Sequence, residues 1–243
     1  MKCPAVAQTT LQTIGNTPLV RLNRVVPGDD ADIIVKLEAF NPSGSYKNRM
    51  ALAMIEGARR IAETDGACWT NQFHNTDSID GYCRIGEELL AQIDTPLDAF
   101  CAGVGTAGML VGVSLALCAA GGAARIVALE PASAAVISTG RPGAHHVEGV
   151  GVGFVPPLLT PGSYDDARGI DEGEARQMAR RLAREEGIFA GTSTGLNIVG
   201  ALHLARELGP GRTVATVACD SGLKYLHGDL FVAETDAAVT NLG

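Results

Sequence analysis

The sequence lacks the cysteine patterns of a zinc site or of a disulfide-stabilised domain. Its six cysteines form no CxxC pair and show no zinc-like spacing, and three of them lie in apolar runs, as small core residues do. No apolar run is long enough to cross a bilayer. The first ten residues contain no apolar core of signal-peptide length. We therefore expect a cytoplasmic protein with no membrane span and no metal site.

Basic residues are also scarce. The 19 lysines and arginines face 27 acidic residues, which gives a net charge of −8 and a pI near 5.1. This balance argues against nucleic acid or an anionic membrane as the main partner. Low-complexity segments and internal repeats are absent. The 243 residues suffice for one large domain or two small ones, and the 30 glycines suit an α/β protein with many tight turns.

Strand and helix patterns alternate along much of the chain. Apolar runs that predict strands occupy 31–40, 98–104, 124–131, 188–191 and 213–219, and a shorter strand lies within 11–22. Helices are predicted at 50–63, 109–122, 169–187 and 196–208, with Asp171 as an N-cap of the third. This alternation predicts a mostly parallel sheet with helices on both faces. The turns that follow the strands then meet at one edge of the sheet, where ligands collect.

The segment NPSGSYKNR (41–49) places Lys47 directly after five turn-forming residues. An ammonium just inside a helix N-terminus is unfavourable, because the positive end of the helix dipole repels it. A neutral lysine, bound covalently through its nitrogen, avoids this penalty. An ordinary surface lysine remains the alternative at this stage.

Two further turns lie between a strand and a helix. GVGTAG (103–108) offers glycines and free helix N-terminal amides to an anion, with Thr106 as an extra hydroxyl. Its GxGxxG spacing also matches a dinucleotide site, for which Glu130 is the candidate acidic residue, and tight packing of helix on strand is the structural alternative. In GTSTG (191–195), Ser193 can face a ring nitrogen or act as an N-cap. A phosphate cup together with an imine-forming lysine is what pyridoxal 5'-phosphate requires.

These turns and several other segments resemble the cysteine synthase and cystathionine β-synthase family of pyridoxal-phosphate enzymes, which have fold type II, like the tryptophan synthase β-subunit. The resemblance covers nearly the whole chain. It rests on TIGNTPLVRLN (13–23), KLEAFNPSGSYKNR (36–49), NQFHN (71–75), DAFCAGVGTAGMLVGV (98–113), GVGVGF (149–154), LAREEGIFAGTSTG (182–195) and SGLKYL (221–226). The fold expected from it is the α/β large domain of these enzymes, with a mostly parallel sheet and helices on both faces.

The resemblance also implies roles for individual residues. Lys47 is the expected catalytic residue and forms the Schiff base with the cofactor, while Ser193 contacts the pyridine nitrogen. Gln72 helps to hold the substrate carboxylate, and Gly149 lies near the substrate amino group. The phosphate loop is expected to consist of Gly105, Thr106, Ala107 and Gly108. Two residues depart from the family pattern: Ala107 replaces a glycine, which is tolerable if its φ is negative, and Met109 replaces a threonine hydroxyl.

The reaction implied is β-replacement on a serine-derived amino acid, such as O-acetylserine or O-phosphoserine with sulfide to give cysteine. The alternatives are β-replacement with another nucleophile, of the cystathionine or diaminopropionate type, and an inactive homologue that binds a protein. A dehydrogenase leaves NPSGSYKNR unexplained. The implied partners are a small amino-acid substrate, a second copy in a homodimer and, by resemblance, the peptide of a serine acetyltransferase-like enzyme.

The resemblance is interrupted after the lysine helix. Family members carry further strand–helix units before the NQF segment, whereas residues 57–69 pass directly across. At roughly 30 residues per unit, two missing units amount to about 60 residues, which is most of the smaller, mobile lobe. We therefore predict a single pyridoxal-phosphate-binding domain over 1–243, in which 36–75 is a remnant of that lobe. Turnover is expected to be severely impaired, because positioning supplies much of catalysis.

Four polar residues have weaker patterns. His74 and Arg84 can approach substrate, Arg84 by selecting an acidic one, although a solvated loop histidine and a helix-surface arginine are the more common structures. The pair His145 and His146 follows a proline–glycine turn and lacks companion ligands for a metal.

Overall fold

The computed structural model describes residues 7–65 and 71–232. Its centre is a six-stranded sheet in the order β1-β2-β6-β3-β4-β5. Only β1 runs antiparallel to its neighbour, so the sheet is mostly parallel, as predicted. The strands are β1 (Leu19–Arg21), β2 (Asp32–Leu37), β3 (Ala99–Gly103), β4 (Arg125–Pro131), β5 (Asp166–Ile170) and β6 (Thr213–Ala218).

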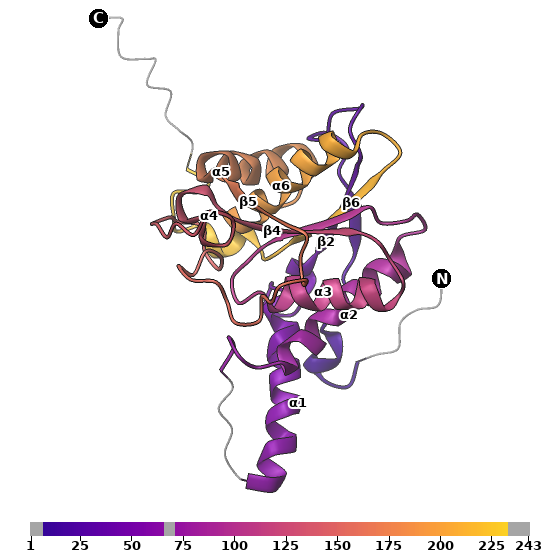
Figure 1. Ribbon diagram of the computed structural model, residues 1–243, viewed down its shortest axis with the longest axis vertical. Coiled ribbons are helices and arrows are strands. Elements are labelled where there is room, and N and C mark those ends of the chain that lie inside the picture. The colour runs from indigo at the N-terminus through magenta and orange to yellow at the C-terminus, as the bar shows by residue number, and fades with distance from the viewer. Residues whose placement is uncertain (1–6, 66–70, 233–243) are drawn as a thin grey trace, which may run out of the picture.

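Helices cover both faces of this sheet. The α-helices are α1 (Lys47–Asp65), α2 (Asp77–Gln92), α3 (Gly108–Ala119), α4 (Val136–Thr139), α5 (Glu172–Arg181) and α6 (Thr192–Leu208). Shorter helical turns are η1 (Thr10–Thr13), η2 (Glu38–Phe40), η3 (Ala132–Ala134), the π-helical η4 (Leu182–Glu186) and η5 (Gly222–Tyr225). Helices α5 and α6 lie above the sheet and α2 and α3 below it, whereas α1 extends away from the body (Figure 1).

The core consists of two apolar layers, one on each face. Successive residues of β3 alternate between them: Ala99 and Cys101 pack toward α5 and α6, and Phe100 and Ala102 toward α2 and α3. All four side chains are fully buried. A strand that is buried on both faces reads as a continuous apolar run, which is why the sequence predicts β3, β4 and β6 well.

One predicted strand is absent, and the strand β5, the helix α2 and the four-residue α4 were not predicted. Residues 188–191 form no strand; Ala190 makes only an isolated bridge to Ser221, because the chain leaves η4 at Gly187 (φ +71) and α6 begins at once. The edge strand β5 escaped prediction because it is polar, with Asp166 and Arg168 forming ion pairs at the surface. Helix α2 also went unpredicted, although its buried Tyr82, Ile85 and Leu89 follow a helical spacing.

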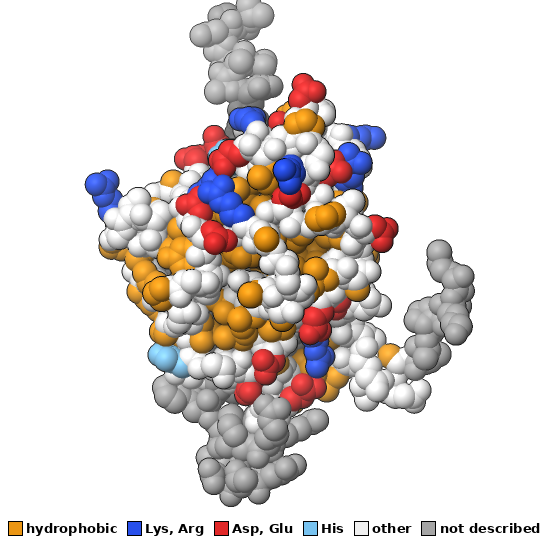
Figure 2. Space-filling model, turned by 45° about the vertical axis from the view of Figure 1, so that its right-hand side comes forward, with side chains coloured by type: hydrophobic (Ala, Val, Ile, Leu, Met, Phe, Trp, Pro, Cys, Tyr) orange, Lys and Arg blue, Asp and Glu red, His pale blue; other side chains and the backbone are white. Residues whose placement is uncertain are grey.

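The surface mixes both signs of charge with apolar side chains. Figure 2 shows charged side chains toward the top of one face, where α5 and α6 lie, and hydrophobic side chains exposed below them. The more exposed large hydrophobic residues include Phe40, Phe154, Val155, Leu223 and Leu226. In the described part of the chain, no helix is long and apolar enough to span a membrane.

Candidate active site

The turns after β2, β3 and β6 meet at the carboxyl edge of the sheet, as the parallel topology requires. A cavity at this edge is lined by Lys47, Gly149, Ser193, Cys219 and Asp220, among others. The structure therefore brings together three of the residues singled out from the sequence. A Cβ placed on Gly149 would lie 3.9 Å from Lys47 Nζ, so the glycine loop (residues 149–153) approaches the lysine closely.

Backbone contacts fix the lysine turn to the segment that follows β6. Tyr46 N donates to Cys219 O at 3.0 Å, Ser221 N donates to Gly44 O at 3.0 Å, and Ser45 bridges Asp220. Gly44 has φ +71, a conformation that glycine adopts without strain. Helix α1 begins at Lys47, so these backbone contacts hold the start of the helix beside the segment that follows β6.

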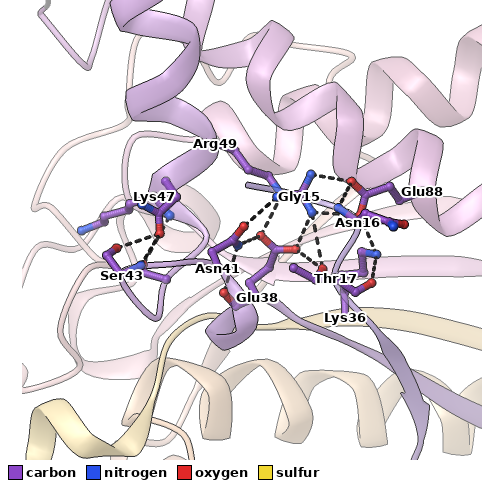
Figure 3. A network of polar contacts seen from close by, with 12 residues as sticks. Gly15, Asn16, Thr17, Lys36, Glu38, Asn41, Ser43, Lys47, Arg49 and Glu88 are labelled. Atoms are coloured by element: carbon purple, nitrogen blue, oxygen red, sulfur yellow. Dashed lines mark hydrogen bonds and ion pairs between the residues drawn. The ribbon is translucent and has the colours of Figure 1, made fainter. Parts of the chain in front are cut away.

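A buried cluster of ion pairs holds the first turn of α1 (Figure 3). Arg49 donates to both oxygens of Glu38, each at 2.8 Å, and to both oxygens of Glu88, at 2.8 and 2.9 Å. The side chain of Lys36 also pairs with Glu88, at 2.7 Å. Burial alone raises the pKa of Glu88, but the hydrogen bonds from Arg49 and Lys36 outweigh burial and lower this pKa to about 2. Lys47 lies two residues from Arg49 and points away from the cluster (Figure 3).

The glycine turn after β3 forms an anion cradle. Among the residues that the structure describes, the backbone N–H groups of Gly105, Thr106 and Ala107 have no hydrogen-bond partner. The hydroxyl of Thr106 instead accepts from Gly108 N, at 3.4 Å, where α3 begins. Free amides at a helix N-terminus favour a negative charge.

Ala107 does not meet the condition under which its substitution for glycine was expected to be tolerable. Its φ is +70, in the left-handed region, where a Cβ costs about 1–2 kcal/mol. The residue is the N-cap of α3, and its methyl group is buried against the α2–α3 layer. Backbone strain at a ligand-binding turn is common, because the surrounding packing holds the residue in place. Met109 is likewise buried in this layer.

The first turn of α6 is fastened between β3 and β6. These strands pair only at Ala99–Val214 and Phe100–Ala215. Beyond that point the buried Asn197 joins them, since its Oδ1 accepts from Gly103 N at 2.7 Å and its Nδ2 donates to Val217 O at 2.8 Å. Thr194 Oγ1 accepts from Cys219 N at 3.0 Å. Ser193 is thereby held at the cavity. The sequence signal for Asn197, a lone amide in an apolar helix, was not used.

The residues after β6 supply an acidic group to the cavity. Tyr225 donates to Asp220 Oδ2 at 3.1 Å, whereas the buried Asp220 Oδ1 has no partner in the described part of the chain. Burial raises the pKa of Asp220. Burial also raises the pKa of the Cys219 thiol to about 12, so this thiol is neutral.

Gln72 is not brought to the cavity. It is exposed in the turn before α2 and is absent from the cavity lining. Its neighbour Phe73 packs on Phe154, with ring centroids 5.3 Å apart, so the segment lies beside the end of the glycine loop. A substrate contact by Gln72 therefore stays a prediction.

Glu130 has a structural role. Its carboxylate accepts from Ile137 N at 2.8 Å and from the amide and hydroxyl of Ser138 at 2.7 and 2.6 Å. It caps the short α4, so its oxygens are engaged and Glu130 is not free to serve as the acidic residue of a dinucleotide site. The described residues also contain no group of three side chains able to hold a metal ion.

Comparisons with known proteins point to one family. Residues 10–60 and 55–220 match the family described as pyridoxal-phosphate dependent enzyme. A cysteine synthase of Staphylococcus aureus is 33% identical over 296 positions, covering 90% of this chain and 96% of the relative. A probable cysteine synthase of Bacillus subtilis is 30% identical, covering 93% and 98%.

Solved structures agree with the sequence relatives. O-ureido-L-serine synthase superposes with a TM-score of 0.87 at 29% identity, covering 96% of this chain and 98% of that one. O-acetylserine sulfhydrylase isoform 3 from Entamoeba histolytica gives a TM-score of 0.89 at 25% identity, covering 95% and 94%. The expected fold type is thereby confirmed.

The comparisons also bear on the interruption after the lysine helix. An alignment of 296 positions exceeds the 243 residues of the chain, so it contains positions that this chain does not fill. The two family segments meet at residues 55–60, within α1. Missing units at this point account for both observations. Residues 66–70, which complete the interrupted segment, lie outside the described residues, and the loss of the smaller lobe stays a prediction.

Residues 105–108 are not part of the cavity lining, but Gly105 packs against Gly149, which is, and the cavity and the anion cradle beside it together fit pyridoxal phosphate. Lys47 provides an amine for its aldehyde, and the free amides of 105–107 provide donors for its phosphate. Gly105 is needed for the close approach of the two loops, because a Cβ there would lie 2.3 Å from Gly149 O. The unpartnered Oδ1 of Asp220 leaves an acceptor for a bound group.

Proposed function

Because the chain belongs to the pyridoxal-phosphate-dependent enzyme family, we propose that it catalyses β-replacement on a serine-derived amino acid. The substrate is an O-acylated or O-phosphorylated serine and the nucleophile is sulfide, as the names of the cysteine synthase relatives suggest. The observation that carries this proposal is the convergence of Lys47, the anion cradle and Ser193 at one sheet edge.

Each residue has a defined task in this reaction. The amides of 105–107 would hold the phosphate of the cofactor, and the hydroxyl of Ser193 would be available to its ring nitrogen. Lys47 would hold the aldehyde of the cofactor, and its free amine would serve as the base that takes the proton from the substrate α-carbon. Pyridoxal phosphate, when bound, supplies an electron-withdrawing ring that stabilises negative charge at that carbon. Ser193 and the Cys219 thiol are both neutral, so neither of them would hold the ring nitrogen protonated.

Covalent labelling tests this function. The purified chain is incubated with pyridoxal phosphate, reduced with borohydride and digested, and the labelled peptide is identified by mass spectrometry. We expect the label on Lys47 and none in Lys47→Ala. Lys224→Ala is the matched control, because Lys224 lines the same cavity. Label that persists in Lys47→Ala, or a chain that takes up no cofactor, contradicts the proposal.

The nucleophile is a second question. The likeness to O-ureido-L-serine synthase favours a nitrogen or oxygen nucleophile as the alternative to sulfide. Cysteine formation from O-acetylserine or O-phosphoserine with sulfide is to be compared with consumption of the same donors in the presence of hydroxyurea or an amino acid. A donor that is consumed without cysteine formation selects the alternative.

The predicted loss of the smaller lobe lowers the expected rate. We propose that the chain binds the cofactor but turns over slowly, because half of the substrate site is contributed by the lobe in relatives. Steady-state rates equal to those of an intact relative refute this. Cofactor binding with no turnover of any donor favours the inactive, peptide-binding homologue.

We also propose that the chain forms a homodimer. Phe40, Leu223 and Leu226 are 68%, 66% and 56% exposed, and these apolar side chains are available for contact with a second copy of the chain. Light scattering after size-exclusion chromatography is expected to give twice the mass of 25.1 kDa. A mass of one chain at micromolar concentration contradicts the proposal.

A further inference from the structure

His145 lies outside the cavity but contacts the glycine loop, defined as residues 149–153, which forms one wall of it. Gly149, Gly151 and Gly153 have φ values of +85, +64 and +83. Three residues in the left-handed region within five positions make a backbone that only glycines adopt easily, and glycines have the largest conformational freedom to lose. Such a loop needs fixed points from its surroundings to hold one conformation.

The imidazole of His145 supplies two of these fixed points. Its Nδ1 accepts from Val147 N at 3.1 Å. Because an amide N–H can only donate, Nδ1 carries no hydrogen, and the hydrogen of the neutral ring therefore lies on Nε2. Nε2 then donates to Gly151 O, at 2.8 Å. One ring holds the backbone two residues before Gly149 and two residues after it.

Other contacts of the glycine loop join it to the end of β3, to the anion cradle and to Lys47. Gly151 N donates to Val104 O at 2.9 Å, which places the loop against the end of β3. A Cβ on Gly105 would meet Gly149 O at 2.3 Å, and a Cβ on Gly149 would lie 3.9 Å from Lys47 Nζ. Gly151 itself must lack a side chain, since a Cβ there would lie 2.5 Å from His145 Nε2. Gly149 thus stands between the anion cradle and the lysine, and His145 fixes its place.

We propose that His145 is a positioning residue that clamps the glycine loop, and thereby sets the affinity of the cavity for the amino-acid substrate. The inference rests on the proposed function, because the substrate is taken to bind beside Gly149. The clamp itself is a property of the free protein.

Three substitutions separate the two hydrogen bonds. His145→Asn keeps an acceptor at the position of Nδ1, His145→Gln keeps a donor near the position of Nε2, and His145→Ala removes both. His146→Gln is the matched control, because the side chain of His146 is 86% exposed and pairs only with Glu172 in the described part of the chain. Melting temperatures identify variants that fail to fold.

The first measurement is amide hydrogen exchange of peptides spanning 147–153 in the cofactor-free protein. We expect faster exchange in His145→Ala than in the parent, intermediate rates in the Asn and Gln variants, and no change in His146→Gln. Unchanged exchange in a folded His145→Ala overturns the clamp.

The second measurement is a titration of the pyridoxal-phosphate-loaded proteins with L-serine, followed by visible absorbance. We expect the serine concentration at half-saturation to rise about tenfold in His145→Ala, which loses both hydrogen bonds. In the Asn and Gln variants, which each lose one, we expect it to rise about threefold. Cofactor content should not change. A serine midpoint in His145→Ala equal to that of the parent overturns the positioning role. A parent that takes up no cofactor contradicts the proposed function instead, and the exchange data then decide the clamp.

Discussion

The buried ion pairs at the start of α1 make a strong prediction about stability. Arg49 is 1% exposed and makes four hydrogen bonds with the carboxylates of Glu38 and Glu88. Arg49→Met removes the cation and leaves a fully buried Glu38 carboxylate without its charged partner. Loss of one member of a buried pair costs about 3–5 kcal/mol, against a total stability of about 5–15 kcal/mol for a typical domain. Urea unfolding at pH 7 measures the difference in free energy of unfolding.

The chain offers a matched control on its surface. Arg181 also makes a two-bond contact with a glutamate, Glu185, at 2.8 and 2.9 Å, but both side chains are 34% exposed. Water replaces the lost partner there, so Arg181→Met should change the unfolding free energy little or not at all. Comparable losses in Arg49→Met and Arg181→Met refute the reasoning, because burial is the main difference between the two pairs.

A second comparison identifies the cause of the loss. If the cost arises from an unpaired buried charge, neutralising that charge recovers part of it. Arg49→Met combined with Glu38→Gln should therefore be more stable than Arg49→Met alone. A double variant in which the two losses simply add indicates that packing of the arginine stem, not charge, dominates.

Three further predictions follow from single positions. The lowered pKa of Glu88, about 2, means that its stabilising contribution is complete above the ordinary carboxyl pKa near 4.5 and is lost as pH falls toward 2. Over this window the unfolding free energy should drop by about 2 kcal/mol more in the parent than in Glu88→Gln, because the other carboxyl groups titrate in both proteins. Gly105→Ala should reduce pyridoxal-phosphate retention at least tenfold in fluorescence titration, because its Cβ would meet Gly149 O at 2.3 Å, whereas Gly28→Ala, with open space around it, should match the parent. The Cys219 thiol, with a pKa of about 12, should resist iodoacetamide at pH 8 until urea unfolds the chain, and rapid alkylation of the folded protein contradicts its burial.

Local sequence chemistry predicted the turn that carries Lys47 after β2, but it placed before Ser193 a strand that the structure lacks. Lys47 and Ser193 each follow a turn signal after an apolar run, and parallel strands bring such turns together. The topology of the sheet then brings together residues that lie far apart in the sequence. Lys47 and Ser193, 146 positions apart in sequence, line one cavity. Lys47 follows β2, and Ser193 follows the bridge between Ala190 and Ser221, so both lie at the same edge of the sheet.

Contacts between distant side chains could not be predicted in this way. The partner of Arg49 on α2, Glu88, lies 39 residues away in a helix that was not predicted. The positive φ of Ala107 likewise depends on how the chain turns from β3 into α3. The replacement of a glycine by alanine in the sequence gives no information on this turn. In His145, the two ring nitrogens are engaged by backbone groups, which have no sequence signature. The sequence pattern around His145 indicated only that further ligands for a metal site were lacking.

The position of the interruption within α1 separates cofactor binding from turnover. The ion pairs hold the lysine end of this helix, where Arg49 is buried, whereas the two family segments meet at residues 55–60, two turns further along. The anion cradle and Ser193 belong to β3, α3 and α6, which lie outside the segment where the lost units are predicted. Loss of those units should therefore leave the cofactor bound and the substrate poorly held. The prediction is supported if the chain binds pyridoxal phosphate as tightly as an intact relative but reacts slowly. Weak cofactor binding together with slow turnover contradicts it, because the lysine end of α1 would then not be held in place.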